Sequence, residues 1–293
     1  MIHIDKIDLH MHTTVSDGTD TPAEILEKVR NEGLEMFAVT DHDAVKASLI
    51  IRDLLKPGDP FFLVGTEFSC RDDEGKYHIL GYAYDPDSEP VQSVIRTGHG
   101  YRMKKLQARL DFLAEEFGFK LPDEEVEGLK ALDNPGKPHI GNLLTRYGYT
   151  ESKDIAIKKY INKLRIRNEY VRPEEAIKGI LASGGIPVLA HPSYGSGDQI
   201  IVGEEMDERL KRLIGFGLQG VEVFYSGFTA KLEREMLGFA EQYGLYATAG
   251  SDYHGSNKLI PLGDTNLPAG TEYPEGLKKF IEAVKTAPGH YAL

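Results

Sequence analysis

Short apolar runs and amphipathic segments alternate along most of the chain. Runs such as Met36–Val39 and Ile186–Ala190 are uniformly apolar, which is typical of parallel strands buried on both faces. The segments between the runs carry helix signals: Thr21, Pro22 and Glu24 provide a capping residue, a first-turn proline and a capping-box glutamate. Repeated alternation of strand and helix predicts an α/β fold built on a mostly parallel sheet.

The alternation stops near residue 86, and only helical segments separated by Pro and Gly are predicted from there to residue 171. Just before this block, the turn residues Asp72–Gly75 predict a hairpin. The hairpin places His78 on an antiparallel partner of the strand that carries Glu67. A helical block inserted in a barrel is expected to cover the rim of the barrel. We therefore expect two units, a barrel formed by residues 1–85 and 172–293 and a helical cap formed by residues 86–171.

The pattern fixes the expected elements along the chain. Strands are predicted at 6–10, 36–39, 61–69, 77–84, 186–191, 220–225 and 245–249. Helices are predicted at 21–30, 43–55, 91–117, 124–132, 139–147, 155–164, 173–183, 207–216, 230–243 and 273–286.

Composition narrows the class of protein. The chain has 293 residues and is 41% hydrophobic, enough for one barrel-sized core. It has no apolar run long enough to span a membrane and no signal-peptide pattern at its start, so we expect a cytoplasmic protein without a membrane partner. The single cysteine, Cys70, excludes an internal disulfide. A net charge of −12 argues against long nucleic acids and is compatible with a small anionic substrate.

Six of the ten histidines lie at or just after the ends of predicted strands, most of them close to an Asp or Glu in the sequence. A lone histidine in such a place is more often a hydrogen-bonded core or loop residue than a ligand. Six at equivalent positions favour a metal cluster, because the carboxyl ends of parallel strands meet on one face. Imidazole and carboxylate ligands suit Zn, Fe or Mn. The six are His10, His12, His42, His78, His191 and His254.

The motifs occur in a characteristic order. Asp-x-His-x-His at 8–12, Ser-Asp-Gly at 16–18, Thr-Asp-His at 40–42 and Gly-x-Glu at 65–67 are followed by His-x-Leu-Gly-Tyr at 78–82, Ala-His-Pro at 190–192 and Ser-Asp-x-His at 251–254. This order resembles the PHP family, named for polymerase and histidinol phosphatase. The helical block occupies the place where one branch of stand-alone PHP phosphoesterases carries a cap. The resemblance implies a distorted (β/α)7 barrel that holds two or three divalent metal ions.

The resemblance also implies the ligands of each ion. The first ion would take His10, His12, Glu67 and Asp252; the second would share Glu67 and add His78 and His191; the third would take Asp17, His42 and His254. Of these residues, Glu67, His191, Asp252 and His254 are expected to be essential for catalysis. Asp17 departs from members that carry His at that position, and an oxygen ligand there favours Mn or Fe over Zn. We expect Asp8 and Asp41 to orient imidazole rings from behind.

Five further side chains are candidates for contacts with the substrate. Lys137 and His139 belong to a basic-Pro-His-Ile segment that resembles one in capped members, and Arg102 lies on a charged helix. Arg and Lys suit phosphate groups, although a charged helix face is more often simply solvated. Tyr194 and Tyr225 lie near the ends of predicted strands. Three roles are open for them: stacking on a base, hydrogen bonding to a phosphate, or packing alone.

Phosphoester hydrolysis fits such a cluster, because water bridging two cations yields a hydroxide nucleophile at neutral pH. The resemblance to capped PHP members implies, as the leading expectation, removal of the 3′-phosphate from a nucleoside 3′,5′-bisphosphate, which leaves the 5′-monophosphate. The alternatives are a 5′-to-3′ exoribonuclease acting on short RNA, a histidinol phosphate phosphatase, and a structural metal-binding module without activity. The sequence leaves the general acid and the oligomeric state open.

Overall fold

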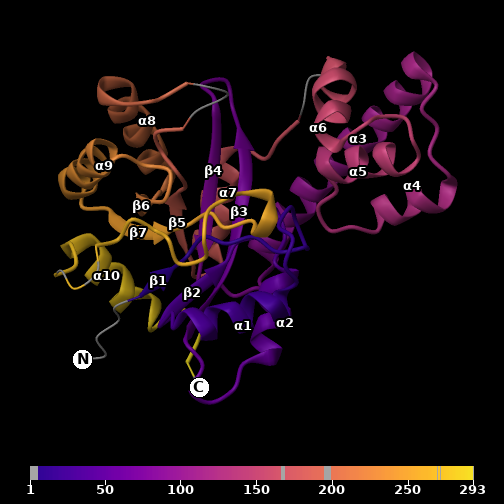
Figure 1. The fold of residues 1–293 in the computed structure, drawn as a ribbon. Helices are drawn as coiled ribbons and strands as arrows, with labels where there is room; N and C mark the ends of the chain where they lie inside the picture. The colour runs from indigo at the N-terminus through magenta and orange to yellow at the C-terminus, as the bar shows by residue number, and fades with distance from the viewer. Residues whose placement is uncertain (1–5, 166–168, 195–198, 269, 271, 293) are drawn as a thin grey trace.

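A curved sheet of seven strands forms the centre of the molecule (Figure 1). The computed structural model describes residues 6–165, 169–194, 199–268, 270 and 272–292. Along the sheet the strands follow in chain order: β1 (Ile7–Asp8), β2 (Met36–Val39), β3 (Phe61–Arg71), β4 (Lys76–Tyr82), β5 (Ile186–Leu189), β6 (Gly220–Tyr225) and β7 (Tyr246–Gly250). Among these seven strands the pairings are parallel except those of β4, which runs antiparallel to both β3 and β5.

The two outer strands of this sheet approach each other. The backbone N–H of Leu9 donates to the carbonyl of Ala249 at 2.9 Å, and Met11 bridges to Tyr253. The sheet is therefore a nearly closed barrel, distorted by the antiparallel β4. The predicted α/β fold, a distorted (β/α)7 barrel, is confirmed.

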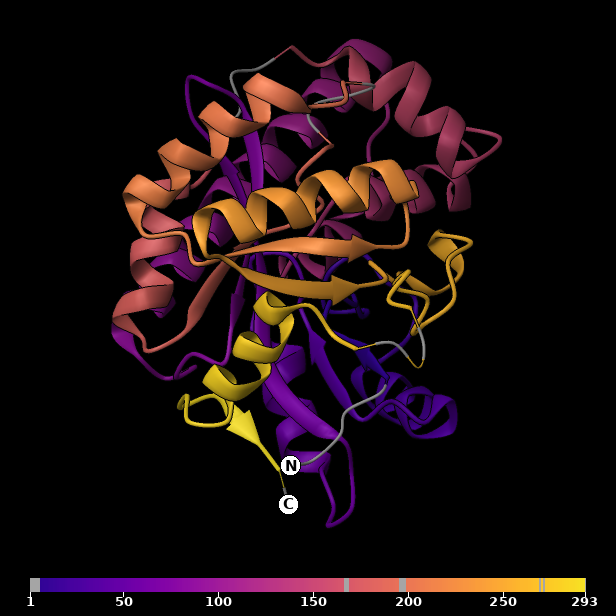
Figure 2. The same ribbon diagram turned by 90° about the vertical axis from the view of Figure 1, so that its left-hand side faces the viewer.

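Helices cover the outside of the barrel, and Figure 2 shows α9 and α10 against β6 and β7. Each follows a strand or precedes the next one, as the alternation of apolar runs predicts. The bounds are α1 (Pro22–Glu32), α2 (Lys46–Leu54), α7 (Pro173–Ala182), α8 (Gly203–Phe216), α9 (Ala230–Tyr243) and α10 (Glu275–Val284). The predicted capping box at Thr21 and Glu24 is present at the start of α1. None of the described helices is long and apolar enough to cross a lipid bilayer.

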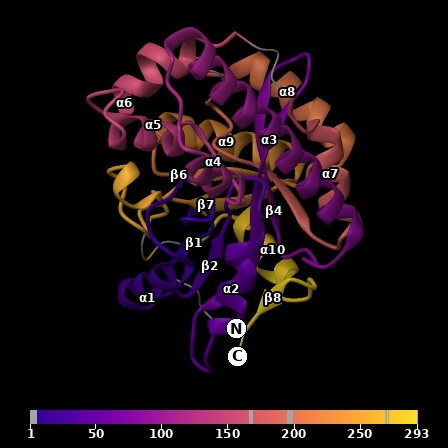
Figure 3. The same cartoon turned by 90° about the vertical axis from the view of Figure 1, so that its right-hand side faces the viewer.

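A second group of helices lies to one side of the barrel and has its own hydrophobic cluster (Figures 1 and 3). It comprises α3 (Glu89–Phe117), α4 (Asp123–Lys130), α5 (Lys137–Arg146), α6 (Lys153–Ile155), the π-turn η1 (Ala156–Tyr160) and the 3-10 turn η2 (Ile161–Lys163). The long helix α3 joins the two groups: Val91 and Val94 pack in the barrel core, whereas Leu106 and Leu113 pack in the second cluster. The predicted boundaries of the cap remain a prediction, and residues 1–5, 166–168, 195–198, 269, 271 and 293 of the predicted ranges lie outside the described residues.

Several elements differ from the sequence expectation. The helix predicted at 207–216 is α8, which begins at Gly203, and the helix predicted at 155–164 is divided into α6, η1 and η2. Helix α2 begins at Lys46 rather than at residue 43, because Asp43 has a left-handed backbone (φ 50°) and its carboxylate accepts the N–H of Ser69 at 2.9 Å. The short strand β8 (His290–Tyr291), which pairs with β3, was not predicted. A two-residue strand has no alternation that a sequence pattern can reveal.

Candidate metal centre

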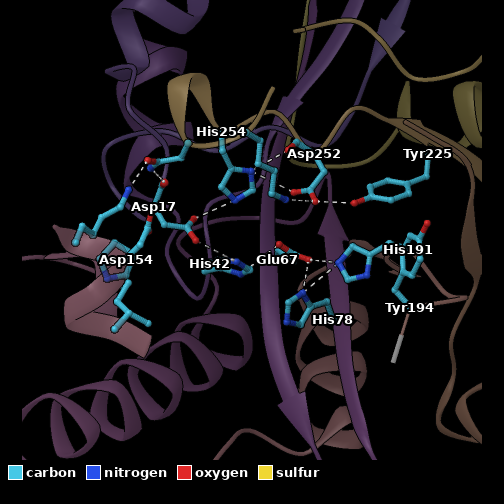
Figure 4. A pocket seen from close by; sticks show the side chains of 15 residues that line it. Asp17, His42, Glu67, His78, Asp154, His191, Tyr194, Tyr225, Asp252 and His254 are labelled. Carbon is cyan, nitrogen blue, oxygen red and sulfur yellow. Dashed lines mark hydrogen bonds and ion pairs between the residues drawn. The ribbon is translucent and has the colours of Figure 1, made fainter. Parts of the chain in front are cut away.

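The predicted ligands gather at one end of the barrel, where they surround Glu67 (Figure 4). The sheet explains why. His42, His191 and Asp252 follow the carboxyl ends of parallel strands, and these ends face the same side. The antiparallel hairpin brings His78 of β4 beside Glu67 of β3, since Ser69 pairs with His78 in the register.

The first group consists of His10, His12, Glu67 and Asp252, as predicted. Glu67 Oε2 lies 3.3 Å from His10 Nε2 and 3.1 Å from His12 Nε2, while Asp252 Oδ1 lies 3.6 and 3.4 Å from the same two atoms. Ligand atoms that share one ion at about 2.0–2.2 Å lie roughly 3–3.6 Å apart. Both Nε2 atoms are buried without a hydrogen-bond partner among the described residues. Unpartnered imidazole nitrogens facing carboxylates at this spacing fit a divalent cation.

The second group combines Asp17, His42 and His254, as predicted, and adds His12. Asp17 Oδ1 is 3.3 Å from His254 Nε2 and 3.7 Å from His12 Nδ1, and Asp17 Oδ2 is 3.9 Å from His42 Nε2. The Asp17 side chain is 36% exposed, in contrast to the buried first group. The second group is therefore more open to solvent than the first.

Glu67 connects these groups to a third. Its Oε1 lies 2.7 Å from His78 Nδ1 and 3.1 Å from His191 Nε2. Its Oε2 lies 3.2 Å from His42 Nδ1, for which the described part of the chain offers no hydrogen-bond partner. The sequence analysis paired His78 with His191. The structure supports this through their 3.2 Å separation but also places His42 within reach of the same group. The two oxygens of Glu67 thus face different imidazoles, which is the arrangement of a bridging carboxylate.

Burial and the neighbouring charges have opposite effects on the pKa values of the side chains in this cluster. Burial alone would raise the pKa of Glu67 and of Asp252, but the surrounding imidazoles hold both pKa values well below the usual range. Burial alone would lower the pKa of His12, yet the carboxylates of Asp252 and Glu67 raise it to about 9. Burial lowers the pKa of His42 to about 3, so His42 is held neutral, as a ligand must be.

Asp8 and Asp41 form no hydrogen bond to an imidazole ring of the described residues, but Asp41 contacts His12 through one intermediate: it accepts the hydroxyl of Ser16, which lies 3.3 Å from His12 Nδ1. The Asp8 carboxylate accepts the N–H and hydroxyl of Ser251 and the N–H groups of Gly263 and His10, and Asp41 also accepts the N–H and hydroxyl of Thr13. Both carboxylates therefore fix backbone segments that carry ligands.

Two contacting residues were missed by the sequence analysis. Glu222 of β6 lies 2.9 Å from His10 Nδ1, and Lys258 Nζ lies 2.5 Å from Asp252 Oδ2. A signal for Glu222 was present, since it is the only charged residue in the apolar run Gly220–Tyr225, and a buried carboxylate needs partners. Lys258 follows the last motif in an irregular loop, where no pattern marks it.

A cleft of about 550 Å³ opens above the cluster. Tyr194 and Tyr225 form one wall, and the hydroxyl of Tyr225 donates to Asp252 Oδ2 at 3.0 Å. The cap contributes residues from helices α5 and α6 and the turn η1. The lining residues from the cap are Pro138, Lys153, Asp154 and Ile157.

A second cavity, of about 310 Å³, adjoins the cleft and shares four of its lining residues, Asp17, His42, His78 and Pro138. Side chains from the hairpin, α3 and α5 give it a strongly basic lining: Lys76, Arg102, Lys105, Arg109 and Lys137. Arg102 forms an ion pair with Asp43 at 2.6 Å, whereas the other four form no ion pair with any described carboxylate. We call this the basic cavity.

The predicted substrate residues have different outcomes in this geometry. Arg102 and Lys137 line the basic cavity, and Tyr194 and Tyr225 line the cleft. His139 is not among the residues that line either space. Instead its Nδ1 accepts the N–H of Gly136 at 3.1 Å and caps the start of α5.

The PHP domain model matches residues 8–215. A phosphoribosyl 1,2-cyclic phosphate 1,2-diphosphodiesterase from Eggerthella lenta is 29% identical over 269 residues, 89% of this chain and 99% of that protein. A 5′-3′ exoribonuclease from Haemophilus influenzae is 26% identical over 268 residues, 88% and 93% of the two chains.

Two further proteins are similar over most of their length. A 3′,5′-nucleoside bisphosphate phosphatase from Chromobacterium violaceum is 29% identical over 265 residues, 85% of this chain and 87% of that protein. A crystal structure from Bifidobacterium adolescentis, of a protein classed as a metal-dependent phosphoesterase, superposes with a TM-score of 0.76 at 26% identity. It covers 94% of this chain and 96% of that one. These matches and the imidazole–carboxylate cluster agree, and the chain belongs to the PHP domain family of metal-dependent phosphoesterases.

Proposed function

We propose that this phosphoesterase hydrolyses a nucleoside 3′,5′-bisphosphate to the nucleoside 5′-monophosphate and inorganic phosphate. The observation that carries the proposal is the basic cavity beside the metal centre. Four cations without carboxylate partners in a partly buried cavity favour an anion, and a phosphate is the common anion that Arg and Lys bind. A substrate with two phosphates can place one at the metal centre and the other among the lysine and arginine side chains of the basic cavity. Each phosphate then faces positive charge.

The sizes of the two spaces agree with a small substrate. The cleft and the basic cavity, about 550 and 310 Å³, fall in the range of roughly 300–1,000 Å³ that small-molecule sites occupy. Tyr194 and Tyr225 offer aromatic surface for a ribose or base within the cleft. The relatives' names also point to phosphorylated ribose compounds, as a nucleoside bisphosphate and a phosphoribosyl cyclic phosphate.

Three groups of side chains would hold divalent ions: His10, His12, Glu67 and Asp252; Glu67, His78 and His191; and Asp17, His42 and His254. Ions bound there supply Lewis acidity to the phosphoryl oxygens and lower the pKa of water. The chain's own residues position the substrate. The hydroxyl of Tyr225 and the ammonium of Lys258 both contact Asp252 and limit its movement, while the cap residues close the cleft from above.

Phosphate release from adenosine 3′,5′-bisphosphate by Mn²⁺-loaded protein tests the proposal, with His191→Ala as the control variant. We expect release by the wild-type protein and its loss in the variant. Parallel assays use a 5′-phosphorylated oligoribonucleotide, ribose 1,2-cyclic phosphate 5-phosphate and histidinol phosphate. Faster turnover of one of these by fully metallated protein would replace the nucleoside bisphosphate as the substrate, and no turnover of any would favour the structural module.

The basic cavity predicts a pH dependence. Burial, followed by the nearby Arg102, lowers the pKa of Lys105 to about 7. Lys105 is therefore cationic below that pH and loses its charge above it, so kcat/KM for the bisphosphate should fall as the pH rises through about 7. The measurement is kcat/KM across this range for the wild type and for Lys105→Arg. Arginine keeps its charge, and the fall should be absent in the variant. Identical profiles in both proteins would contradict a role for Lys105.

A further inference from the structure

We propose that Glu222 is a positioning residue shared by two adjacent ion sites, which it links by holding His10 and His191 at the same time. The inference rests on the proposed ion sites and not on the identity of the substrate. Glu222 itself is not in any of the three candidate ligand groups.

The carboxylate of Glu222 has one partner on each oxygen. Oε1 lies 2.9 Å from His10 Nδ1, and Oε2 accepts the backbone N–H of His191 at 2.7 Å. The residue is fully buried, with 0% of its surface exposed. A charge so deep in the protein is retained only where its partners satisfy it, and both partners here belong to the candidate metal centre.

The contact with His10 selects the tautomer that a metal needs. A carboxylate can only accept, so the Nδ1 of His10 carries the proton and donates it to Glu222. The lone pair of Nε2 then points toward Glu67 and Asp252, at 3.3 and 3.6 Å. Metal-binding histidines are commonly oriented in this way by a carboxylate on their other nitrogen.

The contact with His191 acts on the backbone instead of the ring. His191 has a left-handed conformation, with φ of 27°, that non-glycine residues rarely adopt. The hydrogen bond from its N–H to Glu222 helps to hold this conformation. The imidazole consequently faces Glu67 Oε1 at 3.1 Å.

The end of β7 leaves space for this arrangement. A Cβ atom on Gly250 would lie 2.3 Å from His10 Cβ and 2.4 Å from Glu222 Oε1, both too close for any side chain. Glycine at this position therefore allows Glu222 of β6 to reach His10 across the neighbouring strand. Glu222 and His10 are therefore both packed against Gly250 at this end of the barrel.

The test is Mn²⁺ binding to metal-free protein without substrate, for the wild type and for Glu222→Gln. A glutamine has one acceptor oxygen and one NH2 donor, so it cannot accept from both N–H groups. We expect Mn²⁺ affinity to fall by about 10- to 100-fold at the sites that use His10 and His191, the range for loss of such supporting carboxylates. The site formed by Asp17, His42 and His254 should change less.

The matched control is Thr248→Val. Thr248 is buried on β7 and is the register partner of Glu222, and valine keeps its shape. This variant should bind Mn²⁺ like the wild type. A purely structural role for Glu222 predicts that the folded Glu222→Gln protein binds Mn²⁺ with unchanged affinity and stoichiometry, and that result would overturn the proposal.

A second measurement keeps the proposal testable if Glu222→Gln does not fold. The ¹⁵N spectrum of histidine-labelled, Zn²⁺-loaded wild type should show His10 protonated at Nδ1. An unprotonated Nδ1 would exclude donation to Glu222 and refute the proposal. Neither measurement involves turnover, so the test of Glu222 does not depend on whether the protein has the proposed phosphatase activity.

Discussion

The phosphoesterase activity of the Glu67→Gln variant is expected to be more than about 100-fold lower than that of the wild type, the largest of the expected effects. Loss of a carboxylate that only supports a ligand costs about 10- to 100-fold, and loss of a shared ligand should exceed that range. Glu67 lies within 3.3 Å of five imidazoles, through both of its oxygens: His10, His12, His42, His78 and His191. The amide of glutamine has one neutral acceptor oxygen, whereas the carboxylate of Glu67 has two oxygens that share a negative charge. The ligand groups joined by Glu67 would therefore no longer share a ligand.

Steady-state kcat and bound metal per chain should be measured together for this variant. We expect both to fall, with circular dichroism unchanged. Glu241→Gln, on the exposed surface of α9, is the control and should behave like the wild type. A Glu67→Gln protein that keeps its metal content and its kcat would contradict the bridging arrangement.

The ligands of this site could be predicted because barrel topology converts sequence position into spatial position. His42 and His191 lie far apart in the sequence, but each follows a short apolar run, and parallel strands bring their ends together. His78 required one more signal, the turn at Asp72–Gly75, which correctly predicted an antiparallel partner for β3. The local sequence pattern was sufficient to predict a ligand wherever its place in the barrel is set by the strand that carries or precedes it.

The remaining features depend on tertiary packing, which no local pattern contains. Glu222 reaches His10 because the neighbouring strand ends in Gly250, a relation across three strands. Asp43 lies in an expected helix but adopts a left-handed conformation, where its carboxylate pairs with Arg102 from the distant helix α3. These residues are recognised only when the elements are placed in space.

The basic cavity is the clearest case, because its cations come from three separate elements: Lys76 from β4, Lys105 and Arg109 from α3, and Lys137 from α5. On α3 alone, Lys104 and Lys105 are indistinguishable members of a charged helix face. In the structure Lys104 is 68% exposed and pairs with Glu169, whereas Lys105 lies 3.4 Å from the centre of the Tyr170 ring and lines the cavity. Adjacent lysines thus have different environments, and they provide a matched pair for a second test.

The Lys105→Met variant is expected to lose about 10- to 100-fold in kcat/KM for adenosine 3′,5′-bisphosphate, since a hydrogen bond to a charged group contributes about 1.5–3 kcal/mol. Methionine keeps most of the length and apolar character of the lysine stem, so the loss reports the charge. Adenosine 3′-monophosphate has no second phosphate, and its kcat/KM should change by less than about threefold, because the contact is absent in both proteins.

Lys104→Met is the control for this experiment, because Lys104 is exposed and its ion pair with Glu169 lies on the surface. It should leave kcat/KM for both substrates unchanged. An equal loss for the monophosphate and the bisphosphate in Lys105→Met would place Lys105 at the reacting phosphate instead. If neither substrate is affected, the basic cavity does not bind the second phosphate, and the preference for a bisphosphate must arise elsewhere in the cleft.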